Sequence, residues 1–280
     1  MRATSLNLPS RSTKPRSTGL TMCIDSGMPA GAFADAIDSA EEYIDVVKFG
    51  WGTALVTSRL AEKTAILDEY GIGYFFGGTL FEKFVVQRRF EDYLSLCHDH
   101  GCCAIEISNG TIPLTNAAKT AYIAAAAAEF VVFSEVGFKD EERSNALDAG
   151  HWVSYIEEDL DAGSAYVIIE ARESGKSGIC QSDGVIRADV VEHILGAEIP
   201  PDRLMFEAPT KELQTFCITR LGSDVNLGNI SVGEVLATET LRLGLRGDTL
   251  LHFELQNDGE LEAGQLAIRQ QQVEALRARA

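Results

Sequence analysis

VVKFGWG, residues 46–52, is the stretch of sequence that shows most clearly which fold this chain adopts. Its first four residues are almost continuously apolar, which is typical of a strand covered on both faces, and the glycines after them are typical of a turn. Similar runs recur along the chain at intervals of roughly 20 to 40 residues. The expected strands are Leu20–Ile24, Val46–Phe49, Gly73–Phe76, Ala104–Ile107, Val131–Val136, Ala165–Ile169, Leu204–Phe206 and Val225–Leu227.

Segments with a helical spacing of apolar residues fill the gaps between these runs. We expect helices at Phe33–Glu42, Arg59–Tyr70, Phe90–His100, Ala117–Glu129, Trp152–Ala162 and Ser231–Leu245. Strands that alternate with helices build parallel α/β folds, and eight such units close a barrel. The sequence therefore predicts an α/β protein with a single (β/α)8 TIM barrel over residues 19–250.

The two ends of the chain differ from this pattern. Residues 1–18 are basic and rich in Ser, Thr and Pro, so we expect a flexible basic arm. Residues 251–280 are polar and helix-prone, which indicates an appended C-terminal helical extension. Such an extension serves either as an oligomer contact or as a solvated tail.

Composition narrows the classes of function. The 280 residues include 42 acidic and 24 basic ones, a formal net charge of −18, which argues against nucleic acid or an anionic membrane as a partner. The longest apolar stretches run about ten residues, well short of the roughly 20 that cross a bilayer. The six cysteines form no CxxC pair and lie mostly in apolar runs. Buried, reduced thiols and a cytoplasmic location are therefore expected.

Acidic residues stand at the ends of four successive strands: Glu106, Glu135, Glu170 and Glu207. In such barrels the chemistry gathers where strands run into their following loops. A charge inside an apolar strand is costly unless it is paired or bound to metal, and Mg²⁺ prefers oxygen ligands. We therefore expect two or three of these carboxylates to hold one Mg²⁺ ion. The alternative is a structural network in which they pair with Lys48, Lys139, Arg172 or Lys211.

Two loops are candidates for binding a phosphate through backbone amides: Gly77-Gly78-Thr79, and the segment from Asn226 to Asn229. The glycines of the first loop are equally compatible with a simple tight turn. Patterns for triad hydrolysis, a P-loop or a dinucleotide-binding glycine motif do not occur in the sequence. The five histidines lie within or beside the expected helices, so we assign none of them to catalysis.

Several stretches at these strand ends carry a family resemblance. They are residues 14–16 (KPR), 43–53 (YIDVVKFGWGT), 77–82 (GGTLFE), 105–108 (IEIS), 135–137 (EVG), 159–163 (DLDAG), 170–175 (EARESG), 206–209 (FEAP), 225–230 (VNLGNI) and 241–249 (LRLGLRGDT). In these stretches the sequence resembles the phosphosulfolactate synthase family, known from coenzyme M biosynthesis. The resemblance covers nearly the whole chain between about residues 14 and 250.

The resemblance implies a Mg²⁺-dependent lyase that adds sulfite to phosphoenolpyruvate and forms the (2R) form of phosphosulfolactate. It also implies a homo-oligomer, with a trimer as the expected form. On this basis we assign Glu106, Glu135 and Glu170 to the metal, Lys48 and Arg172 to binding anions, and Lys139 to donating a proton. The further substrate-binding candidates are Asp25, Gly77, Gly78, Thr79, Ser108, Glu207, Lys211, Asn226 and Asn229.

The chain departs from the family pattern at Ser26, Asn109, Phe138 and Leu213. Two alternatives therefore stay open beside the synthase. One is a divergent enzyme that adds a different nucleophile to phosphoenolpyruvate or a related enol phosphate. The other is a non-catalytic, stress-associated barrel.

Overall fold

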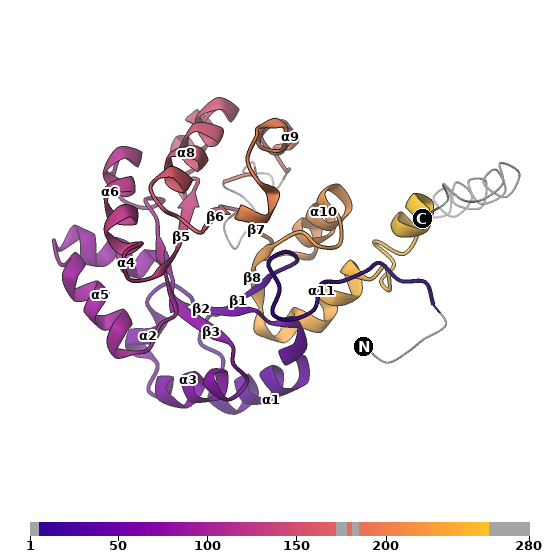
Figure 1. Cartoon of the computed structure of the whole chain (residues 1–280), viewed down its shortest axis with the longest axis horizontal. Helices are drawn as coiled ribbons and strands as arrows, with labels where there is room; N and C mark the ends of the chain where they lie inside the picture. Colours follow the sequence, from indigo (N-terminus) through magenta and orange to yellow (C-terminus); the bar gives the residue numbers. More distant parts are fainter. Residues whose placement is uncertain (1–5, 172–177, 181–184, 258–280) are drawn as a thin grey trace, which may run out of the picture.

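The computed structural model describes residues 6–171, 178–180 and 185–257, and it forms a barrel of eight parallel strands (Figure 1). The order of the strands in the sheet is β3-β2-β1-β8-β7-β6-β5-β4. The strands are β1 Thr21–Asp25, β2 Val46–Phe49, β3 Gly73–Phe76, β4 Ala104–Ile107, β5 Val131–Val136, β6 Tyr166–Ile169, β7 Leu204–Glu207 and β8 Leu227–Ser231.

Helices follow the strands and form the outer layer. They are α1 Ala30–Ala40, α2 Thr53–Val56, α3 Leu60–Glu69, α4 Gly78–Val86, α5 Phe90–Asp99, α6 Asn116–Ala126, α7 Glu141–Ala146, α8 Ala149–Asp161, α9 Ala188–Gly196, α10 Lys211–Leu221, α11 Val235–Arg242 and α12 His252–Asn257. Short 3₁₀ turns are η1 Glu41–Tyr43, η2 Pro201–Arg203 and η3 Val232–Glu234. The predicted (β/α)8 barrel is confirmed.

The eighth strand is the element whose predicted position is wrong. It begins at Leu227 and ends at Ser231, whereas the sequence predicted a strand over 225–227 and a helix from Ser231. Gly228 and Asn229 weakened the strand pattern, because glycine and asparagine are uncommon inside strands. The predicted loop from Asn226 to Asn229 therefore lies mostly within a strand.

Alternate residues of each strand point into the barrel, so the side chains two positions apart share its interior. An apolar cluster fills the interior: Leu20, Met22, Val46, Phe75, Ala104, Phe133, Ile168 and Met205. Five charged residues at the strand ends follow a member of this cluster by two positions: Lys48, Glu106, Glu135, Glu170 and Glu207. Since alternate residues of a strand point to the same face, these charges all point inward, at the carboxyl end of the barrel.

The barrel has one seam. Within the described residues, β3 and β4 are the neighbouring strands that no hydrogen-bonded ladder joins. Near its amino-terminal end the seam is bridged by the Cys103 amide, which donates to Tyr74 O over 3.2 Å. Cys103 is exposed, and the other five cysteines are buried; all six are free thiols.

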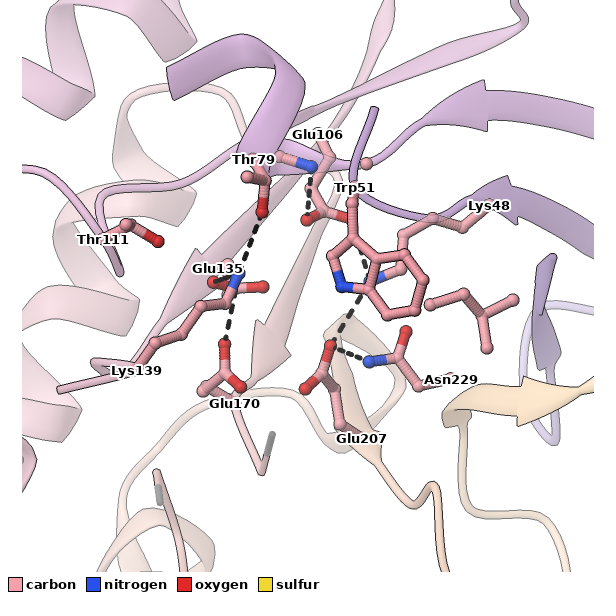
Figure 2. A pocket seen from close by; sticks show the side chains of 13 residues that line it. Lys48, Trp51, Thr79, Glu106, Thr111, Glu135, Lys139, Glu170, Glu207 and Asn229 are labelled. Carbon is pink, nitrogen blue, oxygen red and sulfur yellow. Dashed lines mark hydrogen bonds and ion pairs between the residues drawn. The ribbon is translucent and has the colours of Figure 1, made fainter. Parts of the chain in front are cut away.

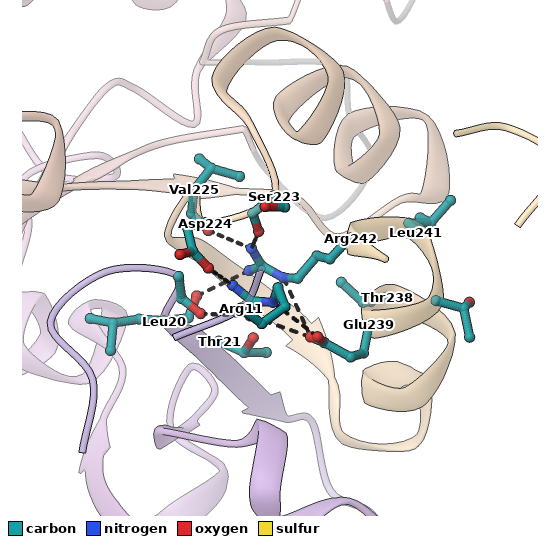
Figure 3. A network of polar contacts seen from close by, with 12 residues as sticks. Arg11, Leu20, Thr21, Ser223, Asp224, Val225, Thr238, Glu239, Leu241 and Arg242 are labelled. Carbon is teal, nitrogen blue, oxygen red and sulfur yellow. Dashed lines mark hydrogen bonds and ion pairs between the residues drawn. The ribbon is translucent and has the colours of Figure 1, made fainter. Parts of the chain in front are cut away.

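The N-terminal segment is bonded to the barrel and does not form a separate arm over residues 11–16. Arg11 forms ion pairs with Asp224 and with Glu239 on α11, and it donates to Gly19 O over 3.1 Å (Figure 3). Lys14 and Arg16 donate to carbonyl oxygens of residues 41 and 42 at 2.6 and 2.7 Å. The expectation of a flexible arm therefore fails for this stretch.

The predicted C-terminal extension, 251–280, contains α12, and residues 258–280 lie outside the described residues. In the part of the chain that the structure describes, every helix is too short or too polar to cross a bilayer.

Arg242 is the centre of the network that fastens the end of α11 to the barrel. It is fully buried and donates to Ser223 O and Val225 O at 2.7 Å, and to Leu20 O at 3.2 Å.

We expect Arg242→Met to lower the free energy of unfolding by about 3 kcal/mol, because the three carbonyls lose a charged donor. Urea unfolding measures this loss. The control is Arg220→Met, which removes an exposed pair with Glu192 and should leave the free energy of unfolding nearly unchanged. Equal losses in both variants would contradict the prediction.

Candidate active site

A cavity of about 290 Å³ opens at the carboxyl ends of the strands (Figure 2). Its size suits a ligand of a few heavy atoms, because ligand pockets usually measure about 300–1,000 Å³. Its lining residues are Ile24, Lys48, Trp51, Gly77, Gly78, Thr79, Glu106, Thr111, Glu135, Lys139, Glu170, Glu207 and Asn229.

Lys48 lies between two carboxylates. Its ammonium nitrogen is 3.1 Å from Glu106 Oε2 and 3.3 Å from Glu207 Oε1, and all three side chains are almost fully buried. Burial alone would lower the pKa of Lys48, but Glu106 and Glu207 outweigh it and raise that pKa. Lys48 is therefore a fixed positive charge at neutral pH.

Lys139 occupies the matching position on the other side of the cavity. Its Nζ is 3.7 Å from Glu135 Oε1, 3.9 Å from Glu170 Oε2 and 3.4 Å from Thr79 Oγ1. Burial opposes its charge, but Glu135 and Glu170 raise the pKa of Lys139 well above its ordinary value. Lys139 is about a quarter exposed, so its ammonium group is the more accessible of the two lysines.

Glu170 is a fully buried carboxyl group of the cavity, and its pKa is raised. Burial, followed by the repulsion of Glu135 and Glu207, raises the pKa of Glu170 well above its ordinary value, and Lys139 offsets this only in part. Carboxylates crowded in this way favour a bound proton or cation. The cavity therefore has capacity for further positive charge beside Lys139.

The start of α4 is joined to the end of β4 through Glu106. The Gly78 amide donates to Glu106 Oε1 over 2.8 Å. A Cβ at position 78 would lie 2.6 Å from that oxygen, so only glycine allows the approach. The Gly77 amide donates to Phe49 O over 2.9 Å. The amides of Gly77 and Gly78 are therefore already hydrogen-bonded within the protein, contrary to the expected phosphate site. Thr79 lies in the first turn of a helix, where backbone amides lack intrahelical acceptors.

Two residues at the cavity have left-handed backbone angles that glycine usually takes. Trp51 has φ 53° and Asn229 has φ 55°. Strain of this kind costs about 1–3 kcal/mol and is concentrated at functional sites. Figure 2 shows the Asn229 amide directed at Glu207, to which it donates a hydrogen bond.

The structure brings most of the predicted site residues together. The members that line the cavity are Lys48, Gly77, Gly78, Thr79, Glu106, Glu135, Lys139, Glu170, Glu207 and Asn229. The structural network considered as an alternative is realised in part, because Lys48 and Lys139 do pair with these carboxylates. Arg172, assigned to anion binding, lies outside the described residues.

Asp25 and Lys211 are directed elsewhere. Asp25 follows Ile24, which faces the cavity, so the strand alternation turns its side chain toward the helices, where it pairs with the buried Lys63 of α3. Lys211 begins α10 and pairs with Asp248 at 3.0 Å on the surface. Neither lines the cavity.

Asn226 lies at the opposite end of the barrel. Its amide nitrogen donates to Asp202 O and Leu204 O, both at 3.0 Å, and its oxygen accepts from the Leu20 amide. The expectation that Asn226 lies at the mouth is therefore wrong, because β8 starts after it. Ser108 is close to the mouth but buried behind it, where it donates to Glu82 Oε1 over 2.7 Å.

The sequence analysis missed Ile24, Trp51, Thr111 and Glu82. Trp51 had a usable signal, since it stands between two glycines directly after a strand end. Glu82 lies on α4 and accepts from the Thr111 amide over 3.3 Å, and burial raises its pKa. Glu82 lies on a helix, whereas the sequence pattern indicated only residues at strand ends.

The three expected metal ligands do not converge. In residues 6–171, 178–180 and 185–257, no three His, Cys, Asp or Glu side chains are arranged to hold one metal ion. The two oxygens of Glu106 are engaged, since the Gly78 amide donates to Oε1 and Lys48 pairs with Oε2. Glu135 and Glu170 remain as a pair around Lys139.

Fold and site together define the class of the protein: a (β/α)8-barrel enzyme whose mouth presents two ammonium groups among four buried carboxylates. The chain belongs to the (2R)-phospho-3-sulfolactate synthase (ComA) family, whose model matches residues 9–248. The resemblance noted in the sequence is thereby confirmed.

Relatives of known name agree with this membership. The chain is 52% identical over 245 residues to the phosphosulfolactate synthase of Bacillus subtilis, covering 88% of this chain and 97% of that protein. It is 42% identical over 246 residues to the phosphosulfolactate synthase of Methanothermobacter thermautotrophicus, covering 86% and 95%. The corresponding protein of Methanocaldococcus jannaschii is 40% identical over 235 residues, covering 82% and 93%.

Solved structures that resemble this one share the fold alone. The 3-hexulose-6-phosphate synthase of Salmonella typhimurium aligns with a TM-score of 0.52 at 13% identity, covering 80% of this chain and 98% of that chain. The YdjI aldolase of Escherichia coli aligns with a TM-score of 0.50 at 11% identity, covering 89% and 84%.

Proposed function

We propose that this protein is a phosphosulfolactate synthase that adds sulfite to phosphoenolpyruvate. Family membership supports the reaction, since its named relatives are phosphosulfolactate synthases. The observation that carries the proposal is the pair of lysines, each held between two buried carboxylates at the mouth. A cavity of about 290 Å³ with two ammonium groups suits a small anion with a three-carbon skeleton.

The reaction needs a proton donor and stabilisation of negative charge. Sulfite forms a carbon–sulfur bond to the methylene carbon of phosphoenolpyruvate, and the electron pair of the double bond moves toward the carboxylate. Protonation of the carbon that bears the phosphate then completes the addition. We assign this proton to Lys139 Nζ, because its ammonium group is charged and is more exposed to the cavity than that of Lys48.

Lys48 has a different role in this proposal. Two carboxylates fix its position, and they keep it protonated. A preorganised charge of this kind stabilises an anion that develops during the reaction, without reorganisation at that moment. We therefore assign Lys48 to the substrate carboxylate or phosphate.

Mg²⁺ is proposed as the cofactor, with Glu135 and Glu170 as its protein ligands. The described lining residues provide four carboxylates against two lysines, so a divalent cation would balance the charge of the cavity. Mg²⁺ is usually held by only one or two carboxylates, together with water and substrate phosphate, so two ligands are sufficient. When bound, the ion would supply electrostatic stabilisation to the substrate anion.

The assay that tests the function uses purified protein, phosphoenolpyruvate, sulfite and Mg²⁺, followed by phosphorus NMR. We expect the phosphoenolpyruvate signal to be replaced by that of a saturated phosphate ester, only when sulfite is present. Removal of divalent ions with EDTA should lower the rate by about 100-fold, and added Mg²⁺ should restore it. Consumption that does not depend on sulfite would contradict the synthase and favour a different nucleophile. No consumption, despite a folded protein, would favour the non-catalytic barrel.

We further propose a homo-oligomer in the cytoplasm. Leu55 and Val56 on α2 support the oligomer, because they are 58% and 82% exposed although large and apolar. The net charge of −18 supports the absence of nucleic acid and membrane as partners.

A further inference from the structure

A second cavity, of about 470 Å³, lies at the amino-terminal end of the barrel. The first residues of five neighbouring strands, β2 to β6, line it: Val46, Gly73, Ala104, Val131 and Tyr166. It shares no lining residue with the cavity at the mouth. Apolar side chains of the interior, such as Met22, Ile168 and Met205, fill the space between the two ends.

Arg16 gives this cavity an unused hydrogen-bonding capacity. Its side chain is only 2% exposed, and it lines the cavity. One nitrogen, Nη2, donates to Glu42 O, and Nε forms an ion pair with Asp45 Oδ1 over 3.5 Å, whereas Nη1 is buried without a hydrogen-bond partner in the described part of the chain. Buried charged donors are nearly always satisfied, so Nη1 indicates a ligand acceptor.

The charges around Arg16 favour a monoanion. Lys14 and Arg16 both line the cavity, and Asp45 is the acidic residue among the lining side chains. Asp45 is already engaged, since its Oδ2 accepts from the Thr21 amide and its Oδ1 is 3.5 Å from Arg16 Nε. Two cations and one carboxylate leave a single positive charge to be balanced.

The rest of the wall is apolar and includes flat rings. Phe133 and Tyr166 stack with ring centroids 4.9 Å apart and planes within 17°. The cavity also contacts the seam between β3 and β4, where Gly73 and Ala104 contribute little side-chain volume. A ligand that fits therefore combines one planar acidic group with a flat apolar body.

The basic side of the cavity is preorganised. Lys14 and Arg16 belong to the segment that Arg11 fastens to Asp224 and Glu239, as Figure 3 shows for Arg11. Both side chains are also bonded to carbonyl groups of residues 41 and 42. Ligand binding would therefore not have to order the side chains of Lys14 and Arg16, because folding has already fixed them.

We propose that the cavity at the amino-terminal end of the barrel is a second ligand site, which binds a small organic monoanion of the aryl carboxylate class. Arg16 contacts the carboxylate of the ligand, and the Phe133 and Tyr166 rings contact its apolar body. The site is independent of the reaction proposed for the mouth.

Titration calorimetry of the full chain with 2-naphthoate tests this site. We expect saturable binding with Kd below about 1 mM, and binding at least about tenfold weaker for Arg16→Met, which keeps an apolar side chain but removes the charge. The neutral analogue 2-naphthalenemethanol should bind the wild type about tenfold more weakly than the acid. Lys139→Met, altered at the mouth, should bind 2-naphthoate as the wild type does.

A second variant keeps the test decisive if Arg16→Met does not fold. Val131 lines the cavity and is 47% exposed, so Val131→Trp should obstruct the cavity at little cost to folding and weaken 2-naphthoate binding about tenfold. The proposal is overturned by any of three results: no saturable binding, equal binding of the acid and the alcohol, or binding lost in Lys139→Met but retained in the variants of the amino-terminal cavity.

Discussion

Lys139→Ala is expected to lower kcat by about 10²–10⁴-fold, the range for removal of a general acid. The ammonium group of Lys139 lies between Glu135 and Glu170 and keeps its proton at neutral pH. Without it, the carbon that bears the phosphate must take its proton from water. Steady-state kinetics with phosphoenolpyruvate and sulfite measure the loss.

Lys139→Arg separates proton donation from charge. Arginine retains the positive charge between the two carboxylates, but its guanidinium gives up a proton even less readily than the lysine ammonium group, and its planar fork places the nitrogens elsewhere than Lys139 Nζ. We expect this variant to fold and to remain at least about 100-fold slower than the wild type. Lys83→Ala on the exposed face of α4 is the matched control and should turn over normally. A Lys139→Arg enzyme with full activity would show that the charge alone matters.

Glu170→Gln is expected to lower activity by about 100-fold and to raise stability at high pH. Burial and the charges of Glu135 and Glu207 raise the pKa of Glu170 above its value in the unfolded chain. The folded state therefore binds this proton more tightly, so the contribution of Glu170 to stability is lost as the pH rises through the raised pKa. The amide does not titrate, and the variant gains relative to the wild type over that interval.

The direction of this gain can be measured by thermal unfolding, since each kcal/mol shifts Tm by about 2–4 °C in a chain of this size. Thermal unfolding at pH 5 and pH 8 should show a difference between variant and wild type that grows in favour of Glu170→Gln at the higher pH. Glu69→Gln, at an exposed position, should change Tm equally little at both values.

Mg²⁺ provides a readout of Glu170 besides activity. A ligand that binds only the folded state raises Tm, so Mg²⁺ should stabilise the wild type. The same ion should leave the Tm of Glu170→Gln nearly unchanged, because one of its two proposed carboxylate ligands is gone. A Mg²⁺-induced increase that is equal in both proteins would remove Glu170 from the proposed metal site.

The charged strand ends show how far the sequence could predict the site. Lys48, Glu106, Glu135 and Glu207 were found from the sequence because a charge in an apolar strand needs a local reason, and that reason is visible without coordinates. The sequence did not predict how these charges pair, namely Lys48 with Glu106 and Glu207, and Lys139 with Glu135 and Glu170. Which carboxylate pairs with which lysine depends on the stagger of strands that are distant in the sequence.

The expectations for Asp25 and Asn226 were wrong because they too depended on the exact register of the strands. Asp25 is a carboxylate at a strand end, as the site requires. Its neighbour Ile24 faces the cavity, so the side chain of Asp25 points to the other face of the strand, toward the helices and Lys63. Asn226 was misplaced because β8 starts later than its apolar pattern suggested. The hydrogen bond from Gly78 to Glu106 and the ion pair of Lys48 with Glu106 form only when α4 and β2 come to lie against the end of β4.

The sequence by itself determined the barrel, the family and the kinds of charge at its mouth, because apolar strand runs, their spacing and short motifs are local properties of the chain. Only the tertiary structure decided which charges neutralise one another, that Arg11, Lys14 and Arg16 are bonded to the barrel, and that Arg16 lines a second cavity. These outcomes depend on contacts between residues far apart in the chain, and hydrophobic periodicity carries no information about such contacts.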